Sequence, residues 1–91
     1  MRTFSRTNQF KRDVKRAERR GKNLTKLKAV LERLIDGEPP PPEWRDHPLR
    51  GDFAGSRDCH IESDWVLIYT LTEQGTHVRF ERTGTHSDLF R

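Results

Sequence analysis

The chain has 91 residues, of which 18 are Lys or Arg and 14 are Asp or Glu, so its formal charge is +4. With 31% apolar and 35% charged residues, it has room for one small core and excludes a two-domain enzyme with a cofactor fold of its own. No apolar run reaches the roughly 18 residues that a membrane-spanning helix needs. The single cysteine, Cys59, cannot form an internal disulfide. We therefore expect one domain over residues 1–91, located in the reducing cytoplasm.

The charge is divided unevenly along the chain. Residues 1–37 carry 12 Lys or Arg against 4 Asp or Glu, whereas residues 38–91 carry 6 Arg against 10 Asp or Glu. A basic half favours a polyanion or an acidic partner. All four histidines lie in the other half, where they could move protons near neutral pH. The alternative is a solvated helical surface beside incidental histidines.

The basic half predicts two helices. Over residues 7–20, Phe10, Val14 and Ala17 recur at the spacing of one helix face, and most other positions are charged or polar. A second apolar stripe predicts a helix over residues 24–36, ended by a glycine. Only a few residues join the two segments, so an antiparallel helical hairpin is expected.

The remaining segments have the pattern of strands. We expect strands over residues 2–5, 56–62, 65–71 and 76–82. Four prolines at residues 39–42 end the second helix and form a stiff connector to the sheet. Helices followed by strands predict a two-layer α+β fold, with the hairpin on one face of a mainly antiparallel sheet of four to five strands. No element is left to cover the other face, which would be free for a substrate.

Four kinds of site are open to these residues. A metal site has enough His, Cys and carboxylate ligands, but no pair has the spacing of a zinc motif. A thiol nucleophile would have to be Cys59, which alternates onto the presumed core face. Metal-free cleavage of RNA needs a base for the 2′-hydroxyl proton, an acid for the leaving 5′-oxygen and a cation for the phosphate charge. The fourth alternative is binding alone, with the basic helices on nucleic acid or on an acidic protein.

The groups needed for RNA cleavage are present in the sequence. Imidazole titrates near neutral pH, and the arginine side chain can donate two hydrogen bonds to one phosphate. The candidates are His47, His60, Asp64, Arg82 and His86. Arg82 is in phase with Val78 and Phe80 of the presumed core. It can reach the open face only if its strand ends, twists or bulges nearby.

Three blocks of sequence together resemble the YafQ-type toxins of bacterial toxin–antitoxin modules, within the RelE/ParE superfamily. The blocks are residues 46–51, 55–69 and 79–90, and the resemblance extends over nearly the whole chain. It implies a RelE-like, microbial-RNase-like α+β fold and an endoribonuclease that cuts mRNA in the ribosomal A site and so inhibits translation. The implied partners are a cognate antitoxin, the ribosome with its mRNA, and operator DNA through the antitoxin complex. No membrane, cofactor or metal is implied.

The resemblance also assigns roles by matching position. The implied catalytic set is His47, His60, Asp64 and His86. Arg82 would contact the scissile phosphate, and Phe90 would position a base. Asp58 and Trp65 would support the substrate site, although Trp65 also fits a core position. His77 lies outside the motif and is interpreted as a surface residue.

Two other functions remain open at this point. A gyrase-directed toxin of the ParE branch would share the fold, but that branch is not expected to hold a His-rich site. A module without activity, acting with its antitoxin as an operator-binding repressor, would have no need of the intact set of three histidines and Asp64.

Overall fold

The structure is a computed structural model that describes residues 1–90; Arg91 lies outside the described residues. The elements in chain order are β1 (Thr3–Arg6), α1 (Asn8–Arg19), α2 (Leu24–Asp36), β2 (His47–Pro48), β3 (Arg57–Glu62), β4 (Trp65–Thr72), β5 (His77–Gly84) and α3 (His86–Leu89). Single 3-10 turns occupy Pro42–Trp44, Gly51–Phe53 and Glu73–Gly75. Within the described part of the chain, no helix is long and apolar enough to cross a membrane.

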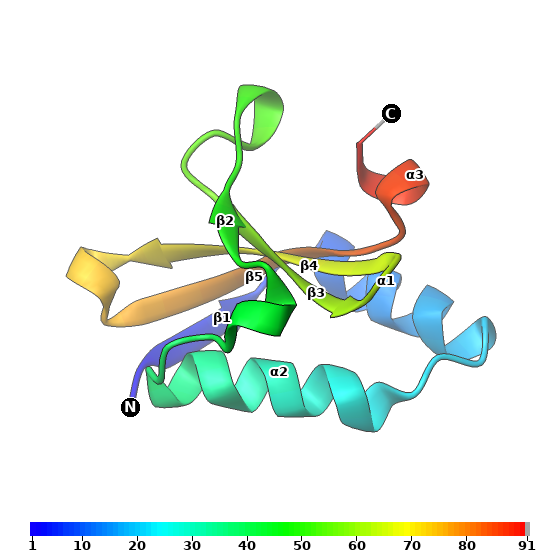
Figure 1. Ribbon diagram of the computed structural model, residues 1–91, viewed down its shortest axis with the longest axis horizontal. Helices are drawn as coiled ribbons and strands as arrows, with labels where there is room; N and C mark the ends of the chain where they lie inside the picture. Colours follow the sequence, from blue (N-terminus) through cyan, green and yellow to red (C-terminus); the bar gives the residue numbers. More distant parts are fainter. Residues whose placement is uncertain (91) are drawn as a thin grey trace.

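The five strands form one mixed sheet in the order β1-β5-β4-β3-β2. β1 runs parallel to β5, and the other neighbours are antiparallel. Figure 1 shows α1 and α2 on one side of this sheet, and the β2–β3 loop and α3 on the other. The predicted α+β fold is therefore confirmed, and the structure has three α-helices and a five-stranded mixed sheet in the described residues.

Local chemistry sets the ends of the two long helices. The side-chain oxygen of Thr7 accepts a hydrogen bond from the Phe10 N–H at 2.9 Å and caps α1. Asn23 caps α2 in the same way by accepting from the Thr25 N–H at 3.0 Å. Gly37 ends α2 with a φ of 82°, a conformation that glycine adopts without strain. Both helices begin and end within one residue of the predicted bounds.

Apolar side chains lie on both faces of the central strand β4. On the helix side, Leu67 and Tyr69 join a core that also contains Phe10, Leu34 and Phe80. On the other side, Val66 and Ile68 are fully buried against Leu49, Phe53 and Leu89. The expectation that this second face is uncovered was therefore wrong at its centre. Its apolar β4 residues have to be shielded from water, and the β2–β3 loop and α3 shield them.

A bulge in β5 reverses the direction of its side chains. The neighbouring β4 residues Tyr69 and Ile68 pair with Phe80 and Arg82. Glu81, which lies between Phe80 and Arg82, therefore has no partner on β4 and is the bulged residue. Arg82 consequently has the same side-chain phase as Ile68 and no longer that of Phe80. This is the kind of irregularity that Arg82 needs to turn away from the core face, as expected from its place in the sequence.

Candidate functional site

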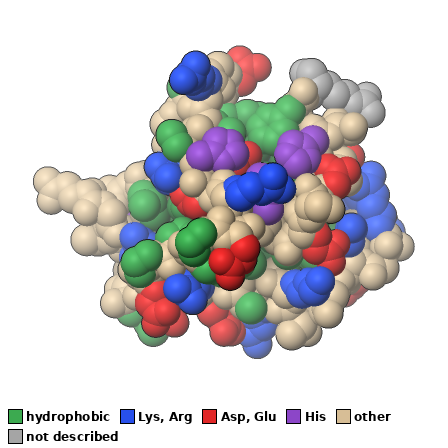
Figure 2. All heavy atoms as spheres, viewed as in Figure 1, with side chains coloured by type: hydrophobic (Ala, Val, Ile, Leu, Met, Phe, Trp, Pro, Cys, Tyr) green, Lys and Arg blue, Asp and Glu red, His purple; other side chains and the backbone are tan. Residues whose placement is uncertain are grey.

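Three histidines that are far apart in the sequence meet on the sheet face that faces away from α1 and α2. His47 lies on β2, His60 on β3, and His86 is the first residue of α3. Figure 2 shows histidine side chains close together on one face of the molecule. The rings of His60 and His86 have centroids 5.4 Å apart. All three imidazoles lie near enough to the Asp58 carboxylate to act on its pKa.

The imidazoles of His47 and His60 are each held through one nitrogen. Nδ1 of His47 lies 2.8 Å from the carbonyl oxygen of Arg45, and Nδ1 of His60 lies 3.2 Å from that of Trp44. A carbonyl oxygen only accepts hydrogen bonds, so in both residues Nδ1 carries the hydrogen. Nε2 is then left to exchange a proton with a substrate.

Asp64 holds the imidazole of His86, which is also bonded through Nδ1. Its carboxylate accepts hydrogen bonds from the backbone N–H of His86 at 3.0 Å and from Nδ1 at 2.7 Å. These two bonds keep the pKa of Asp64 below its usual range. The carboxylate is thus ionised at neutral pH and accepts the Nδ1 hydrogen. In all three imidazoles, Nε2 has no hydrogen-bond partner within residues 1–90 and is available for proton transfer.

The fourth histidine, His77, has a different arrangement. Its Nδ1 lies 2.7 Å from the Thr3 hydroxyl and its Nε2 lies 2.9 Å from the Ser5 hydroxyl. Both ring nitrogens are occupied in bridging β5 to β1, so His77 has no nitrogen left for a substrate. Its role is structural, in keeping with its place outside the sequence motif.

Asp58 lies beneath the three histidines. It is only 3% exposed, and its Oδ1 has no hydrogen-bond partner within residues 1–90. That oxygen is 3.0 Å from Nδ1 of His47, whose hydrogen is directed to the Arg45 carbonyl. Burial raises the pKa of Asp58, and the neighbouring imidazoles partly offset the rise.

Arg82 lies on the same sheet face and is held by α1. Its Nε and Nη2 atoms are 2.7 and 3.3 Å from the carboxylate of Asp13, which also accepts from the Thr83 N–H at 3.2 Å. An open cavity of about 350 Å³ lies beside Arg82. The cavity is also lined by Thr7, Gln9, Asp52, Phe53, Ser56 and Glu81. Arg82 is thus oriented by a buried carboxylate at the border of this cavity.

Sequence reasoning missed Asp13, because acidic and basic positions of the first helix were interpreted as solvated. Asp13 is 2% exposed. It follows Phe10 by three residues and precedes Ala17 by four. This spacing places it on the buried face and was a signal that could have identified it.

Phe90 and Trp65 have different surroundings. Phe90 is 38% exposed, and its ring lies 5.9 Å from that of His86 and 5.8 Å from that of Phe53. Trp65 is 1% exposed, packs on the helix side, and donates a hydrogen bond from Nε1 to Thr83 at 3.0 Å. The predicted contact of Trp65 with the substrate is therefore corrected, because the register of β4 turns its ring toward α1 and α2.

Metal and thiol chemistry find little support in this geometry. No group of three or more His, Cys, Asp or Glu residues within residues 1–90 is arranged to hold a metal ion. Cys59 is fully buried on the helix side, and burial raises the pKa of its thiol. A thiol in this environment is a poor nucleophile.

The fold and the site define a small α+β protein with a basic helical layer on one side of its sheet and three histidines gathered on the other. Residues 2–91 match the family described as "Bacterial toxin of type II toxin-antitoxin system, YafQ". The chain belongs to this family of bacterial toxins, as its sequence motifs predicted.

Individual relatives agree with this assignment. The chain is 49% identical over 83 residues to the mRNA interferase toxin YafQ of Escherichia coli strain K12, covering 90% of this chain and 88% of the relative. The crystal structure of YafQ from E. coli strain BL21(DE3) matches with a TM-score of 0.93 and 44% identity, over 100% of both chains. A crystal structure of the E. coli DinJ–YafQ complex matches with a TM-score of 0.91 and 46% identity, also over 100% of both chains.

Proposed function

We propose that this chain is an mRNA interferase, an endoribonuclease that serves as the toxin of a toxin–antitoxin pair. The relative from E. coli K12 carries that name. The observation that carries the proposal in this chain is the set of three histidines, each anchored through Nδ1, on the sheet face to which the bulge in β5 also turns Arg82. This set also argues against a gyrase-directed toxin and against a module without activity.

In the proposed reaction, the 2′-hydroxyl of one nucleotide attacks the adjacent phosphorus, and the 5′-oxygen of the next nucleotide leaves. One imidazole takes the 2′-hydroxyl proton through Nε2, and a protonated imidazole gives a proton to the leaving oxygen. The buried carboxylate of Asp58 stabilises the imidazolium, and Asp64 keeps His86 in the required tautomer. The products are a 2′,3′-cyclic phosphate and a 5′-hydroxyl, and the reaction uses no metal or cofactor.

Arg82 and Phe90 have supporting roles in this proposal. Arg82 opposes the charge that develops on the phosphate, and its contact with Asp13 fixes the direction of the guanidinium. The partly exposed ring of Phe90 offers a surface on which a base can stack. The cavity beside Arg82 leaves space for a neighbouring nucleotide.

We further propose that the ribosome presents the mRNA in its A site, in the cytoplasm. Exposed basic side chains of α1 and α2 would bind ribosomal RNA phosphates and release counterions. Holding the mRNA in register would supply much of the rate acceleration. The E. coli DinJ–YafQ complex supports an antitoxin as partner, and operator DNA would be reached through that complex.

The chemistry of the RNA ends tests the proposal. A translated mRNA is compared with the same mRNA carrying one 2′-deoxynucleotide at the mapped cleavage position. We expect the first RNA to end in a 2′,3′-cyclic phosphate and a 5′-hydroxyl, and the second to stay intact at that position. Equal cleavage of both RNAs would rule out attack by the 2′-hydroxyl.

A further inference from the structure

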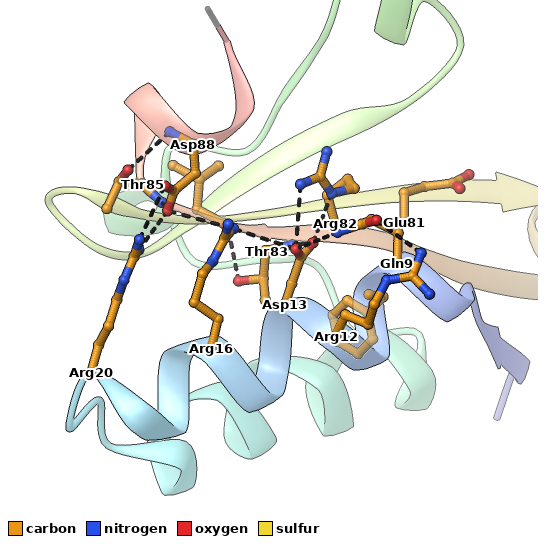
Figure 3. Close-up of polar contacts among 12 residues, drawn as sticks. Gln9, Arg12, Asp13, Arg16, Arg20, Glu81, Arg82, Thr83, Thr85 and Asp88 are labelled. Carbon is orange, nitrogen blue, oxygen red and sulfur yellow. Dashed lines mark hydrogen bonds and ion pairs between the residues drawn. The ribbon is translucent and has the colours of Figure 1, made fainter.

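A chain of ion pairs joins α1 to the short helix α3 that begins with His86, and Figure 3 shows it from the side of α1. The Asp88 carboxylate accepts hydrogen bonds from Nη1 and Nη2 of Arg20 at 2.7 and 3.4 Å. Nη2 of Arg16 lies 3.6 Å from the same carboxylate and 3.4 Å from that of Asp13. The helix that holds Arg82 through Asp13 therefore also holds α3.

Asp88 stabilises α3 from within as well. Its carboxylate accepts a hydrogen bond from the Thr85 N–H at 2.9 Å, and the Thr85 hydroxyl accepts from the Asp88 N–H at 3.0 Å. This reciprocal capping fixes the turn that presents His86. A helix of four residues is not stable alone, so the orientation of α3 depends on contacts such as these.

Gly84 allows the Asp88 carboxylate to approach β5. A Cβ atom at this position would lie 2.9 Å from Oδ2 of Asp88 and 3.3 Å from Nη2 of Arg16. Gly84 is not among the glycines with positive φ, so it provides space rather than an unusual backbone conformation. Two separate features thus place Asp88 against α1 and β5. The ion pairs attract its carboxylate, and the absence of a Cβ at Gly84 leaves space for it.

We propose that Arg20 and Asp88 are positioning residues for His86. Their ion pair anchors α3 to α1, so that His86 keeps its two hydrogen bonds to Asp64 and its place beside His60. The catalytic consequence rests on the proposed function, whereas the anchoring of α3 can be measured without it. Neither residue is assigned a contact with the RNA.

The test uses the full chain with Arg20→Gln, Asp88→Asn and the double variant. Asn at position 88 keeps an oxygen for the Thr85 cap and removes the charge. Arg19→Gln is the matched control, because Arg19 is an exposed neighbour of Arg20 whose side chain makes no hydrogen bond or ion pair within residues 1–90. Arg20→Lys keeps the charge and serves as the conservative variant. Thermal unfolding verifies that every variant is folded.

We expect kcat for cleavage of ribosome-bound mRNA to fall about 10- to 100-fold in Arg20→Gln and in Asp88→Asn, with little change in KM. The double variant should be no slower than either single variant, because all three lose the same contact. Arg20→Lys should recover most of the rate. Arg19→Gln removes one of the basic side chains proposed to bind ribosomal RNA, so any change should fall on KM, and kcat should stay unchanged.

A second readout does not depend on activity. Hydrogen bonds from His86, with a smaller effect of Lys22, lower the pKa of Asp64. If α3 loosens, the pKa of Asp64, followed by NMR, should rise toward its usual range in Arg20→Gln and Asp88→Asn but not in Arg19→Gln. A raised KM in Arg20→Gln and in Arg19→Gln but not in Asp88→Asn, with kcat and the pKa of Asp64 unchanged, would show that these arginines only attract RNA and would overturn the inference. If the unaltered chain cleaves no mRNA, the proposed function fails, and the pKa of Asp64 still decides whether the ion pair positions α3.

Discussion

The imidazole of His86 is about half exposed, and its polar contacts are with Asp64. Replacing it with alanine removes a proton-transfer group without opening the core. We expect His86→Ala to lower mRNA cleavage by at least about 100-fold and to relieve growth arrest, with folding and antitoxin binding unchanged. Growth of cells that express the variant, with its soluble level measured in parallel, provides the test.

His77→Ala is the matched control for this prediction. It removes another imidazole, but one whose two nitrogens are bonded to Thr3 and Ser5. Its toxicity should persist. Full toxicity of a stably folded and well-expressed His86→Ala protein would remove His86 from the proposed mechanism.

Asp58 gives a prediction in which stability and activity move in opposite directions. Burial raises the pKa of Asp58 in the folded state. Stability contributed by this group is therefore fully present below the unfolded pKa of about 4 and is lost as the pH rises through the folded pKa. A neutral Asn avoids this loss, so Asp58→Asn should be more stable at pH 7 by about 1 kcal/mol and little changed near pH 3. Cleavage should decrease, because the imidazolium loses its counter-charge.

Urea unfolding at the two pH values, together with a cleavage assay at pH 7, measures both effects. A variant that is less stable than the unaltered chain at pH 7 would contradict this view of Asp58.

The sequence could predict which histidines would come together but not how each ring is held. His47 and His60 belong to motif blocks, so they could be identified from spacing and resemblance. Their Nδ1 contacts go to the backbone carbonyls of Arg45 and Trp44. Every residue has a carbonyl, so no side-chain pattern in the sequence marks these contacts.

Among the elements, α1 and its cap form hydrogen bonds with the part of β5 that has no pairing with β1. The pairing of β1 with β5 ends at Phe80. Beyond it, the Thr7 hydroxyl donates to the Glu81 carbonyl at 2.8 Å, and Asp13 accepts from the Thr83 N–H at 3.2 Å. Side chains of α1 and of its cap thus take the place of a neighbouring strand, and Asp13 adds the contact that orients Arg82.

Asp13→Ala should therefore destabilise the fold by about 2–3 kcal/mol. It leaves the buried Thr83 N–H without an acceptor and Arg82 without its ionic partner. Glu18→Ala, at an exposed position of the same helix, is the control and should change stability by less than about 0.5 kcal/mol. Denaturant unfolding of both variants measures the difference, and equal stabilities would show that Asp13 does not hold this edge.

The helices were predictable because their signals are local. The cap Asn23 and the terminator Gly37 flank α2 directly in the sequence. The parallel pairing of β1 with β5 and the bulge at Glu81 join segments from opposite ends of the chain, so no short window of sequence contains them. The cover over Val66 and Ile68 was missed because it comes from an irregular loop and a four-residue helix.

Over the whole molecule, charge and chemistry are separated onto two sides. The helical layer contains most of residues 1–37, with 12 Lys or Arg against 4 Asp or Glu. The three site histidines belong to β2, β3 and α3. Figure 1 shows the β2–β3 loop and α3 on the side of the sheet away from α1 and α2. A molecule of this kind can bind one polyanion through its helices while its sheet face binds a second polyanion. This separation fits the proposed function, in which the helices bind ribosomal RNA and the sheet face cleaves mRNA.

The most direct measurement maps the cuts in one defined mRNA, either free or on ribosomes stalled with a chosen codon in the A site. The unaltered chain, His77→Ala and His86→Ala are compared under the same conditions. We expect cuts only on ribosomes, within the A-site codon, shifting with that codon when the stall position is moved, and nearly absent with His86→Ala. Equal cutting of free mRNA, or cuts that stay in place when the ribosome is moved, would contradict the proposed ribosome-dependent mechanism.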